Sequence, residues 1–321
     1  MLKRLLKRVA VVVIALPLVT VMVFVIGTRH VPYSIPADSK APEALLKPRQ
    51  GLSVRYLGIT GYELSDGQTV ILVDPTPTRP TVLELISGPL KTDDAHGAEV
   101  CPRAEFILVN HTHHDHALDV PAIALRTGAK VLGSQSTVNL AKSRGVAPDH
   151  TQVVHHGEHL TLGTFTVDVR QSVHSHIAGM SQPMSGLVAA DAGPLWFWQY
   201  ALDETFVYRF ESQGTSVWFH PTSTLQDGEL GGLSSPNLIV GVTGEAQTQA
   251  KVDTFMKEVK PRLVLPTHYD NFFQPMQKGL AAMPAFDMEP AHQMFINAPS
   301  KPTWVVLDYG QTLYLPPDDT P

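Results

Sequence analysis

A short run of histidine and aspartate behind an apolar segment constrains the fold of this chain more than any other feature. The segment FILV at 106–109 is typical of a buried strand, and it leads directly into NHTHHDH at 110–116. Four side chains able to bind a metal therefore fall within six residues, namely His111, His113, Asp115 and His116. Buried imidazoles and carboxylates need polar partners, and one divalent cation such as zinc can satisfy several of them.

The spacing inside this run indicates two metal positions rather than one. In a turn, residues i and i+2 can bind one cation while residues i+4 and i+5 face a second. The competing interpretations are a solvated polar loop and a cloning tag. The interior position of the run, together with the interleaved Thr112 and Asp115, excludes a tag.

Strand-like segments outnumber helical ones in the rest of the chain. Apolar and β-branched runs predict strands at 52–58, 69–73, 106–109, 130–133, 151–154, 159–162, 165–172, 216–219, 238–242 and 263–266, and a hairpin at 304–315. Helical patterns fall at 81–90, 121–127, 137–144 and 246–259. Because the helices occur singly among the strands, we expect an α+β fold in which helices enclose two packed sheets, rather than a doubly wound parallel sheet.

The run at 111–116 resembles the His-x-His-x-Asp-His motif of the metallo-β-lactamase superfamily. Val173-His174-Ser175 follows a predicted strand, as the third histidine of that family does, and Leu265-Pro266-Thr267-His268 is similar to its late Pro-x-His element. The hairpin that ends at Asp74 also looks like the opening of the family's fold. The resemblance covers roughly residues 51–315, and it implies a four-layer αββα sandwich with the histidines at one edge of the sheets.

The resemblance also implies the composition and chemistry of the site. His111, His113 and His174 would form one metal site, and Asp115, His116 and His268 the other. One or two Zn2+ ions, with Mn2+ or Fe2+ as alternatives, would supply a metal-bound hydroxide, and Asp115 would be the catalytic residue that orients it. The expected function is hydrolysis of an ester, lactone or phosphodiester. This chain looks closest to the branch that contains sugar-phosphate lactonases and N-acylphosphatidylethanolamine phospholipase D.

One segment departs from the family pattern. The Asp that usually bridges both metals in the family is absent from the matching segment at 217–223. Thr222 aligns with that Asp, and His220 would face the same side of the strand, either as a substitute ligand or hydrogen-bonded to a ligand. With less negative charge between two cations, the second metal is expected to bind less tightly.

The first 27 residues predict a membrane anchor. Residues 9–27 form a nineteen-residue run without a charge, about 28 Å of helix, and residues 1–8 hold Lys3, Arg4, Lys7 and Arg8. A basic cytoplasmic end would place the remainder in the periplasm or outside the cell. A cleaved signal peptide is the alternative. The expected organisation is a basic end at 1–8, a transmembrane helix at 9–27, a linker at 28–50, the hydrolase domain at 51–315 and a tail at 316–321.

Charge and cysteine content restrict the partners. The formal net charge is -6, and the four basic residues at the start leave -10 for the remainder, so a nucleic-acid partner is not expected. Cys101 is the single cysteine and cannot form an internal disulfide. A buried inert thiol is preferred over a nucleophile.

The aromatic segment PLWFWQY at 194–200 has two interpretations, an apolar pocket wall or a packed core strand. Together with the anchor, the first interpretation favours a small-molecule or lipid-like substrate. The alternative function is a non-catalytic, membrane-tethered binding protein that retains the fold and a structural metal. The sequence leaves the oligomeric state open.

Overall fold

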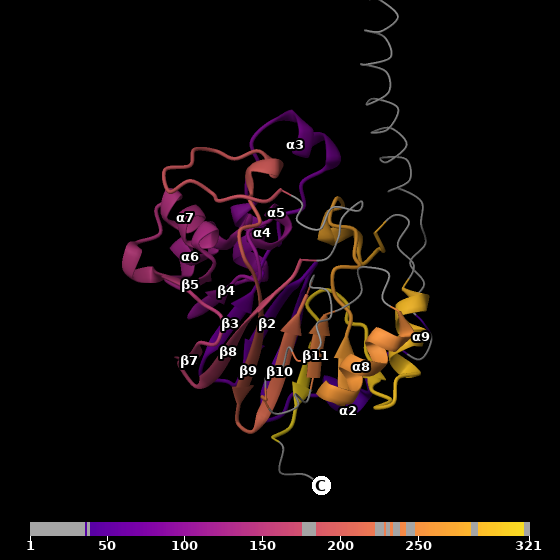
Figure 1. Cartoon of the computed structure of the whole chain (residues 1–321). Coiled ribbons are helices and arrows are strands. Elements are labelled where there is room, and N and C mark those ends of the chain that lie inside the picture. Colours follow the sequence, from indigo (N-terminus) through magenta and orange to yellow (C-terminus); the bar gives the residue numbers. More distant parts are fainter. Residues whose placement is uncertain are drawn as a thin grey trace, which may run out of the picture.

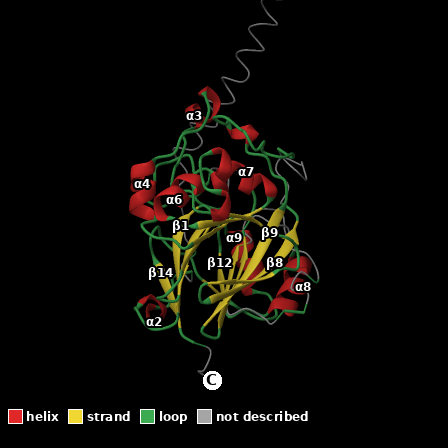
Figure 2. Ribbon diagram, turned by 90° about the vertical axis from the view of Figure 1, so that its left-hand side faces the viewer, coloured by secondary structure: helices red, strands yellow, loops and turns green. Residues whose placement is uncertain are grey.

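The computed structural model describes residues 36, 39–174, 184–221, 228, 232–233, 238–241, 248–283 and 288–317. In this part of the chain two seven-stranded sheets pack face to face, and helices cover the outer face of each (Figures 1 and 2). The predicted α+β architecture with four αββα layers is therefore the one observed.

The first sheet has the strand order β14-β1-β2-β3-β4-β5-β6. Strands β14, β1, β2 and β3 are antiparallel neighbours, whereas β3 to β6 run parallel. The strands are β1 (Leu52–Gly58), β2 (Gly61–Ser65), β3 (Val70–Val73), β4 (Phe106–Leu108), β5 (Lys130–Gly133), β6 (Thr151–Val153) and β14 (Thr312–Leu315).

The second sheet has the order β13-β12-β11-β10-β9-β8-β7. Strands β10 to β13 run parallel, and β7 to β10 are antiparallel. The strands are β7 (His159–Leu162), β8 (Phe165–Ser172), β9 (Thr205–Ser212), β10 (Thr215–His220), β11 (Leu238–Gly241), β12 (Leu263–Leu265) and β13 (Thr303–Trp304).

The helices are short and are ended by local signals. Gly128 ends α6 with the left-handed φ of 76° that the predicted stop requires, and Thr81 caps α3 by accepting the Glu84 N–H. The described helices are α2 (Glu43–Leu46), α3 (Val82–Ser87), α4 (Asp94–Val100), α5 (His114–Ala117), α6 (Val120–Thr127), α7 (Gln135–Ser143), α8 (Gln249–Val259) and α9 (Glu289–Ile296), with 3-10 turns η1 (Pro148–His150), η2 (Phe197–Gln199) and η3 (Met276–Lys278).

Apolar contacts hold the layers together. Between the sheets, Tyr62 of β2 and Phe219 of β10 meet edge to face with ring centroids 6.0 Å apart. Outside the first sheet, Ile123 of α6 and Leu140 of α7 pack with the β4 residue Ile107. Removing such surface from water contributes roughly 25 cal/mol per Å2, which makes burial the main stabilising force.

Two strand predictions need correction. The expected hairpin at 304–315 is wrong, because β13 pairs with β12 in the second sheet whereas β14 pairs with β1 in the first. The chain between them crosses from one sheet to the other. The sequence analysis also missed β9, whose residues are almost all buried between β8 and β10.

The chain joins the folded unit earlier than the predicted boundary at residue 51. Ser39 is fully buried, and its carbonyl accepts the N–H of Val306 at 2.8 Å. Ala41, Leu45 and Leu46 pack against the core, so residues 39–50 belong to the domain and not to a spacer. No described helix is long and apolar enough to cross a membrane, and the run at 9–27 lies outside the described residues.

Candidate metal centre

Three strand ends bring the predicted ligands to one place. β4 ends shortly before His111, β8 shortly before His174, and β12 shortly before His268. Because side chains that follow the ends of packed strands gather at a sheet edge, residues 157 positions apart in sequence become neighbours. The structure brings all six predicted ligands together, as the two trios that the sequence predicts.

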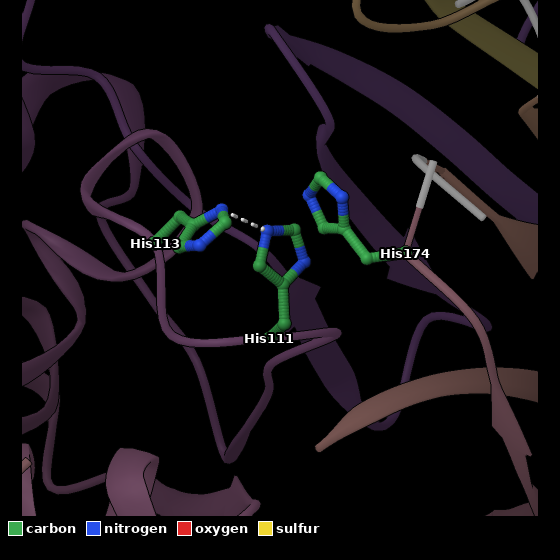
Figure 3. A group of neighbouring side chains, drawn as sticks. All are labelled: His111, His113 and His174. Carbon is green, nitrogen blue, oxygen red and sulfur yellow. Dashed lines mark hydrogen bonds between the residues drawn. The ribbon is translucent and has the colours of Figure 1, made fainter. Parts of the chain in front are cut away.

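The first trio consists of the buried imidazoles of His111, His113 and His174, with one nitrogen of each lying within 4.8 Å of the others. Nε2 of His111 lies 2.9 Å from Nδ1 of His113, and the rings of His111 and His174 meet edge to face with centroids 4.6 Å apart. Figure 3 shows the three rings turned toward one another, two from the loop after β4 and one from the segment after β8. Three convergent imidazoles are a typical zinc ligand set.

The second trio consists of Asp115, His116 and His268, whose ligand atoms also lie within 4.8 Å of one another. Oδ2 of Asp115 is 3.0 Å from Nε2 of His268 and 3.8 Å from Nε2 of His116. The rings of His116 and His111 have centroids 3.9 Å apart, so the two trios adjoin.

Neighbouring side chains fix which nitrogen of a ligand histidine faces its trio. Nδ1 of His111 lies 2.5 Å from Oδ1 of Asn110, so it carries the hydrogen and leaves the lone pair on Nε2. Nδ1 of His116 lies 2.7 Å from Oδ2 of Asp74, which has the same effect. A carboxylate or carbonyl behind a ligand imidazole orients the ring and raises its basicity as a metal ligand.

Three residues around the centre adopt the left-handed backbone conformation that residues other than glycine seldom take. The φ angles are 51° at Ile59, 46° at Asp74 and 60° at His268. Such a conformation costs about 1–3 kcal/mol and persists only where the surroundings enforce it. Here the His268 N–H donates to the Ile59 carbonyl at 2.8 Å, and the Asn110 N–H donates to Asp74 Oδ1 at 2.7 Å.

The environment sets the charges of these groups. Burial and the neighbouring imidazoles push the pKa of His111 well below its ordinary value, which keeps the ring neutral. Burial alone would raise the pKa of Asp115, but the adjacent His116 and His268 hold it well below its ordinary value, so this carboxylate is anionic. For His268, burial would lower the pKa, and the hydrogen bond to Asp115 reverses the direction to a raised pKa. A proton shared by Asp115 and His268 thus lies where a cation would bind.

These donors fit divalent cations. Nε2 of His116 is buried and has no hydrogen-bond partner among the described residues, a costly arrangement for a polar atom unless a ligand occupies it. Five imidazoles and one carboxylate are the donor set that zinc and similar transition metals accept. The trios could therefore each hold one cation.

Other singled-out residues lie outside the trios. The ring of His220, at the end of β10, meets Phe255 of α8 edge to face at 5.7 Å, and neither trio includes it. Thr222 lies outside the described residues. Cys101 is fully buried, and burial raises the pKa of its thiol to about 12, as expected for an inert cysteine. His155 and His156 are exposed between β6 and β7, and His159 is exposed at the first position of β7.

Two residues without an assigned role support the centre. Asn110 directly precedes His111 in the histidine run, and this position is a local signal for the contact between the two side chains. Asp270, two residues after His268, is fully buried and accepts hydrogen bonds from the Ile59 N–H at 2.9 Å and the Tyr309 hydroxyl at 2.8 Å. Nothing in the sequence pairs Asp270 with these distant partners.

The aromatic segment at 194–200 is a loop with the single 3-10 turn η2, not a core strand. The rings of Phe197 and Tyr200 lie 6.1 and 6.4 Å from the ring of His114. His114 is buried between two predicted ligands, and its Nδ1 is 3.8 Å from Oδ1 of Asp115. The aromatic loop therefore contacts His114, which lies beside Asp115 of the second trio.

Comparisons with known proteins identify the family. Residues 53–268 match the family described as the beta-lactamase superfamily domain. A UPF0173 metal-dependent hydrolase from Methylobacterium nodulans is 25% identical over 224 residues, which cover 69% of this chain and 86% of the relative. A UPF0173 metal-dependent hydrolase from Symbiobacterium thermophilum is 35% identical over 95 residues, which cover 30% of this chain and 37% of that protein.

Solved structures agree in fold. The metallo hydrolase Igni18 from Ignicoccus hospitalis superposes with a TM-score of 0.52 at 16% identity, covering 83% of this chain and 98% of that one. CmlA, a diiron β-hydroxylase from Streptomyces venezuelae, gives 0.54 at 14% identity, covering 84% of this chain and 55% of that one.

The chain belongs to the beta-lactamase superfamily and has the metallo-β-lactamase fold. It is a metal-dependent hydrolase, since its relatives carry that name and its own structure assembles two potential metal sites. This identification disfavours the alternative of a non-catalytic binding protein.

Proposed function

We propose that this hydrolase uses two zinc ions, one held by His111, His113 and His174 and the other by Asp115, His116 and His268. The observation that carries the proposal is the convergence of three ligand atoms in each trio within 4.8 Å, with Asn110 and Asp74 orienting the rings from behind. Zinc is favoured because five of the six donors are imidazoles. Iron is the alternative, and one structural neighbour is a diiron enzyme.

The substrate that we propose contains an ester, lactone or phosphodiester bond. Bound cations would polarise the carbonyl or phosphoryl oxygen and make a water acidic enough to attack near neutral pH. Asp115 is anionic, and its Oδ2 faces His268 while Oδ1 lies on the side of His114. We propose that Oδ1 of Asp115 orients the attacking water. His114, buried against Phe197, excludes bulk water from that side.

We further propose that residues 9–27 anchor the enzyme in a membrane and that the hydrolase domain lies in the periplasm or outside the cell. The support is the nineteen-residue uncharged run behind four basic residues. Protease added to intact spheroplasts should digest the domain and spare cytoplasmic markers. Full protection of the domain would contradict this orientation. A shortened mature N-terminus would instead indicate a cleaved signal peptide.

Elemental analysis of the full chain, purified without added metal, tests the proposed centre. We expect roughly one to two equivalents of zinc per chain. Turnover of nitrophenyl esters, a lactone and bis(nitrophenyl) phosphate should be lost on chelation and restored by zinc. The variant His113→Ala should lose both metal and turnover, whereas His155→Ala, at an exposed histidine, is the matched control. A folded protein free of metal, or full turnover by His113→Ala, would overturn the proposal.

A further inference from the structure

Three of the exposed apolar side chains in the described part of the chain lie on α3 and the aromatic loop. Leu83 and Ile86 of α3 are 69% and 48% exposed, and Trp198 of the aromatic loop is 49% exposed. Leu83 and Ile86 are three residues apart, so they share one face of the helix. Single exposed apolar residues are ordinary, whereas a contiguous apolar patch marks an interaction surface.

A backbone hydrogen bond joins these segments. The N–H of Leu90, which follows α3, donates to the carbonyl of Leu195 at 2.8 Å, directly before the aromatic residues. Both views place α3 at the end of the molecule beyond the sheets (Figures 1 and 2). Leu83, Ile86 and Trp198 are therefore called the apolar rim.

An aromatic path leads from the apolar rim to the centre. The ring of Trp198 stacks on Trp196 at 4.8 Å and meets Phe197 edge to face at 5.1 Å. Phe197 in turn lies 6.1 Å from the ring of His114, which stands between His113 and Asp115 in sequence. An apolar chain that lies on the exposed side of these rings would lead toward His114, next to Asp115 of the second trio.

The length of the chain before the domain restricts what can cover the apolar rim. Only residues 28–38 separate the uncharged run from Ser39, which is already buried in the domain. Fully extended, that stretch reaches about 40 Å. If the uncharged run lies in a bilayer, the domain stays near the bilayer surface, and a face with exposed apolar side chains can reach the lipid.

We infer that the apolar rim lies against the surface of the bilayer and that the substrate is an amphiphile whose acyl chain follows the aromatic path. This inference rests on the proposed membrane-anchored hydrolase and adds the substrate class and the contact surface. Tryptophan is favoured at the interface because its ring is apolar and its N–H is polar. In a helix that lies on a membrane, the side chains of its apolar face insert below the headgroups.

Fluorescent labelling of the full chain in vesicles tests the contact. Leu83→Cys and Trp198→Cys would each carry an environment-sensitive dye, since the native Cys101 is buried. Leu125→Cys is the matched control, because Leu125 is 55% exposed and lies on α6, outside the apolar rim. The vesicles contain phosphatidylethanolamine and phosphatidylglycerol, with or without a lipid spin-labelled near the headgroup.

We expect dyes at 83 and 198 to shift to shorter wavelength in vesicles and to be quenched by the spin-labelled lipid, with neither effect at 125. No quenching at 83 and 198, or equal quenching at 125, would overturn the inference. A wavelength shift without quenching would mean that protein covers the rim, and that result also overturns it. Zinc content and turnover of a soluble ester are measured on the same samples, so failure of the membrane contact is distinguishable from failure of the proposed metal centre.

Discussion

The carboxylate of Asp270 accepts the backbone N–H of Ile59, 211 residues away in sequence, at 2.9 Å. The carbonyl of the same Ile59 accepts the N–H of His268. Asp270 therefore holds Ile59 in place, and Ile59 in turn positions His268. Both Ile59 and His268 have left-handed backbone conformations. A candidate metal ligand that follows a short strand of the second sheet is thus positioned by a loop of the first sheet.

Replacing Asp270 by Asn should destabilise the fold. The side chains of Asp270 and Arg79 are 0% and 2% exposed and lie 3.5 Å apart, so the variant leaves a buried guanidinium without its anion. Loss of one member of a buried pair costs about 3–5 kcal/mol. Urea denaturation measures this change. Arg79→Met/Asp270→Asn should be less destabilised than the sum of the single variants, and strict additivity would show that the two side chains do not interact.

Asp74→Asn should weaken metal binding at the second trio by about 10–100-fold, the usual effect of losing a carboxylate behind a ligand histidine. One oxygen of Asp74 accepts the hydrogen on Nδ1 of His116, and the other accepts the Asn110 N–H. The amide of the variant has a single oxygen, so it cannot replace both acceptors. Competitive chelator titration separates the tighter from the weaker metal. Asp66→Asn is the control, because Asp66 supports the turn between β2 and β3 through the N–H groups of Gln68 and Thr69. Equal loss of metal in both variants would contradict this role for Asp74.

Asp119 should make stability depend on pH in the direction opposite to most carboxylates. Burial raises the pKa of Asp119 from 3.8 to about 7, although two hydrogen bonds from Thr78 oppose the shift. Between pH 3.8 and about 7 the folded protein holds a proton on Asp119 that the unfolded chain has released. The stability that Asp119 contributes is therefore complete at low pH and is lost as the pH rises through about 7. The unfolding free energy of wild type relative to Asp119→Asn should therefore fall from about pH 4 to about pH 8. A difference that rises or stays flat would rule out the raised pKa.

Cys101 should not react with Ellman's reagent in the native protein at mildly alkaline pH. The residue is fully buried, and the reactive thiolate is suppressed because burial raises the pKa to about 12. One thiol should become reactive when the protein is unfolded in guanidinium chloride. Prompt reaction of the native protein would show that this region opens locally, and it would also remove the basis for selective labelling at 83 and 198.

The convergence of the six candidate ligands could be predicted from the sequence because each of them follows a strand in a short recognisable segment. His111, His113, Asp115 and His116 are contiguous, and His174 and His268 each follow an apolar run. The residues behind them could not be predicted in the same way. The contact between Asp270 and Ile59 depends on how two distant segments meet in space, which local patterns do not encode.

The errors in the fold have a similar origin. The segment TFVYRFES of β9 has strong strand propensity, so the sequence does contain a signal for this missed strand. The sheet membership of β13 and β14 was not readable, because a turn at Tyr309-Gly310 looks the same whether its flanking strands pair with each other or with different sheets.

Pairing of β14 with β1 also affects when the enzyme can form during synthesis. Leu52 pairs with Leu315, so the edge of the first sheet stays open until the end of the described domain has emerged from the ribosome. All six candidate ligands, the last of them His268, are synthesised before that point. An open strand edge is prone to pair with other chains, and pairing across so long a sequence separation is slow. The arrival of β14, rather than the synthesis of the ligands, therefore sets the moment at which the nascent chain can become a stable enzyme.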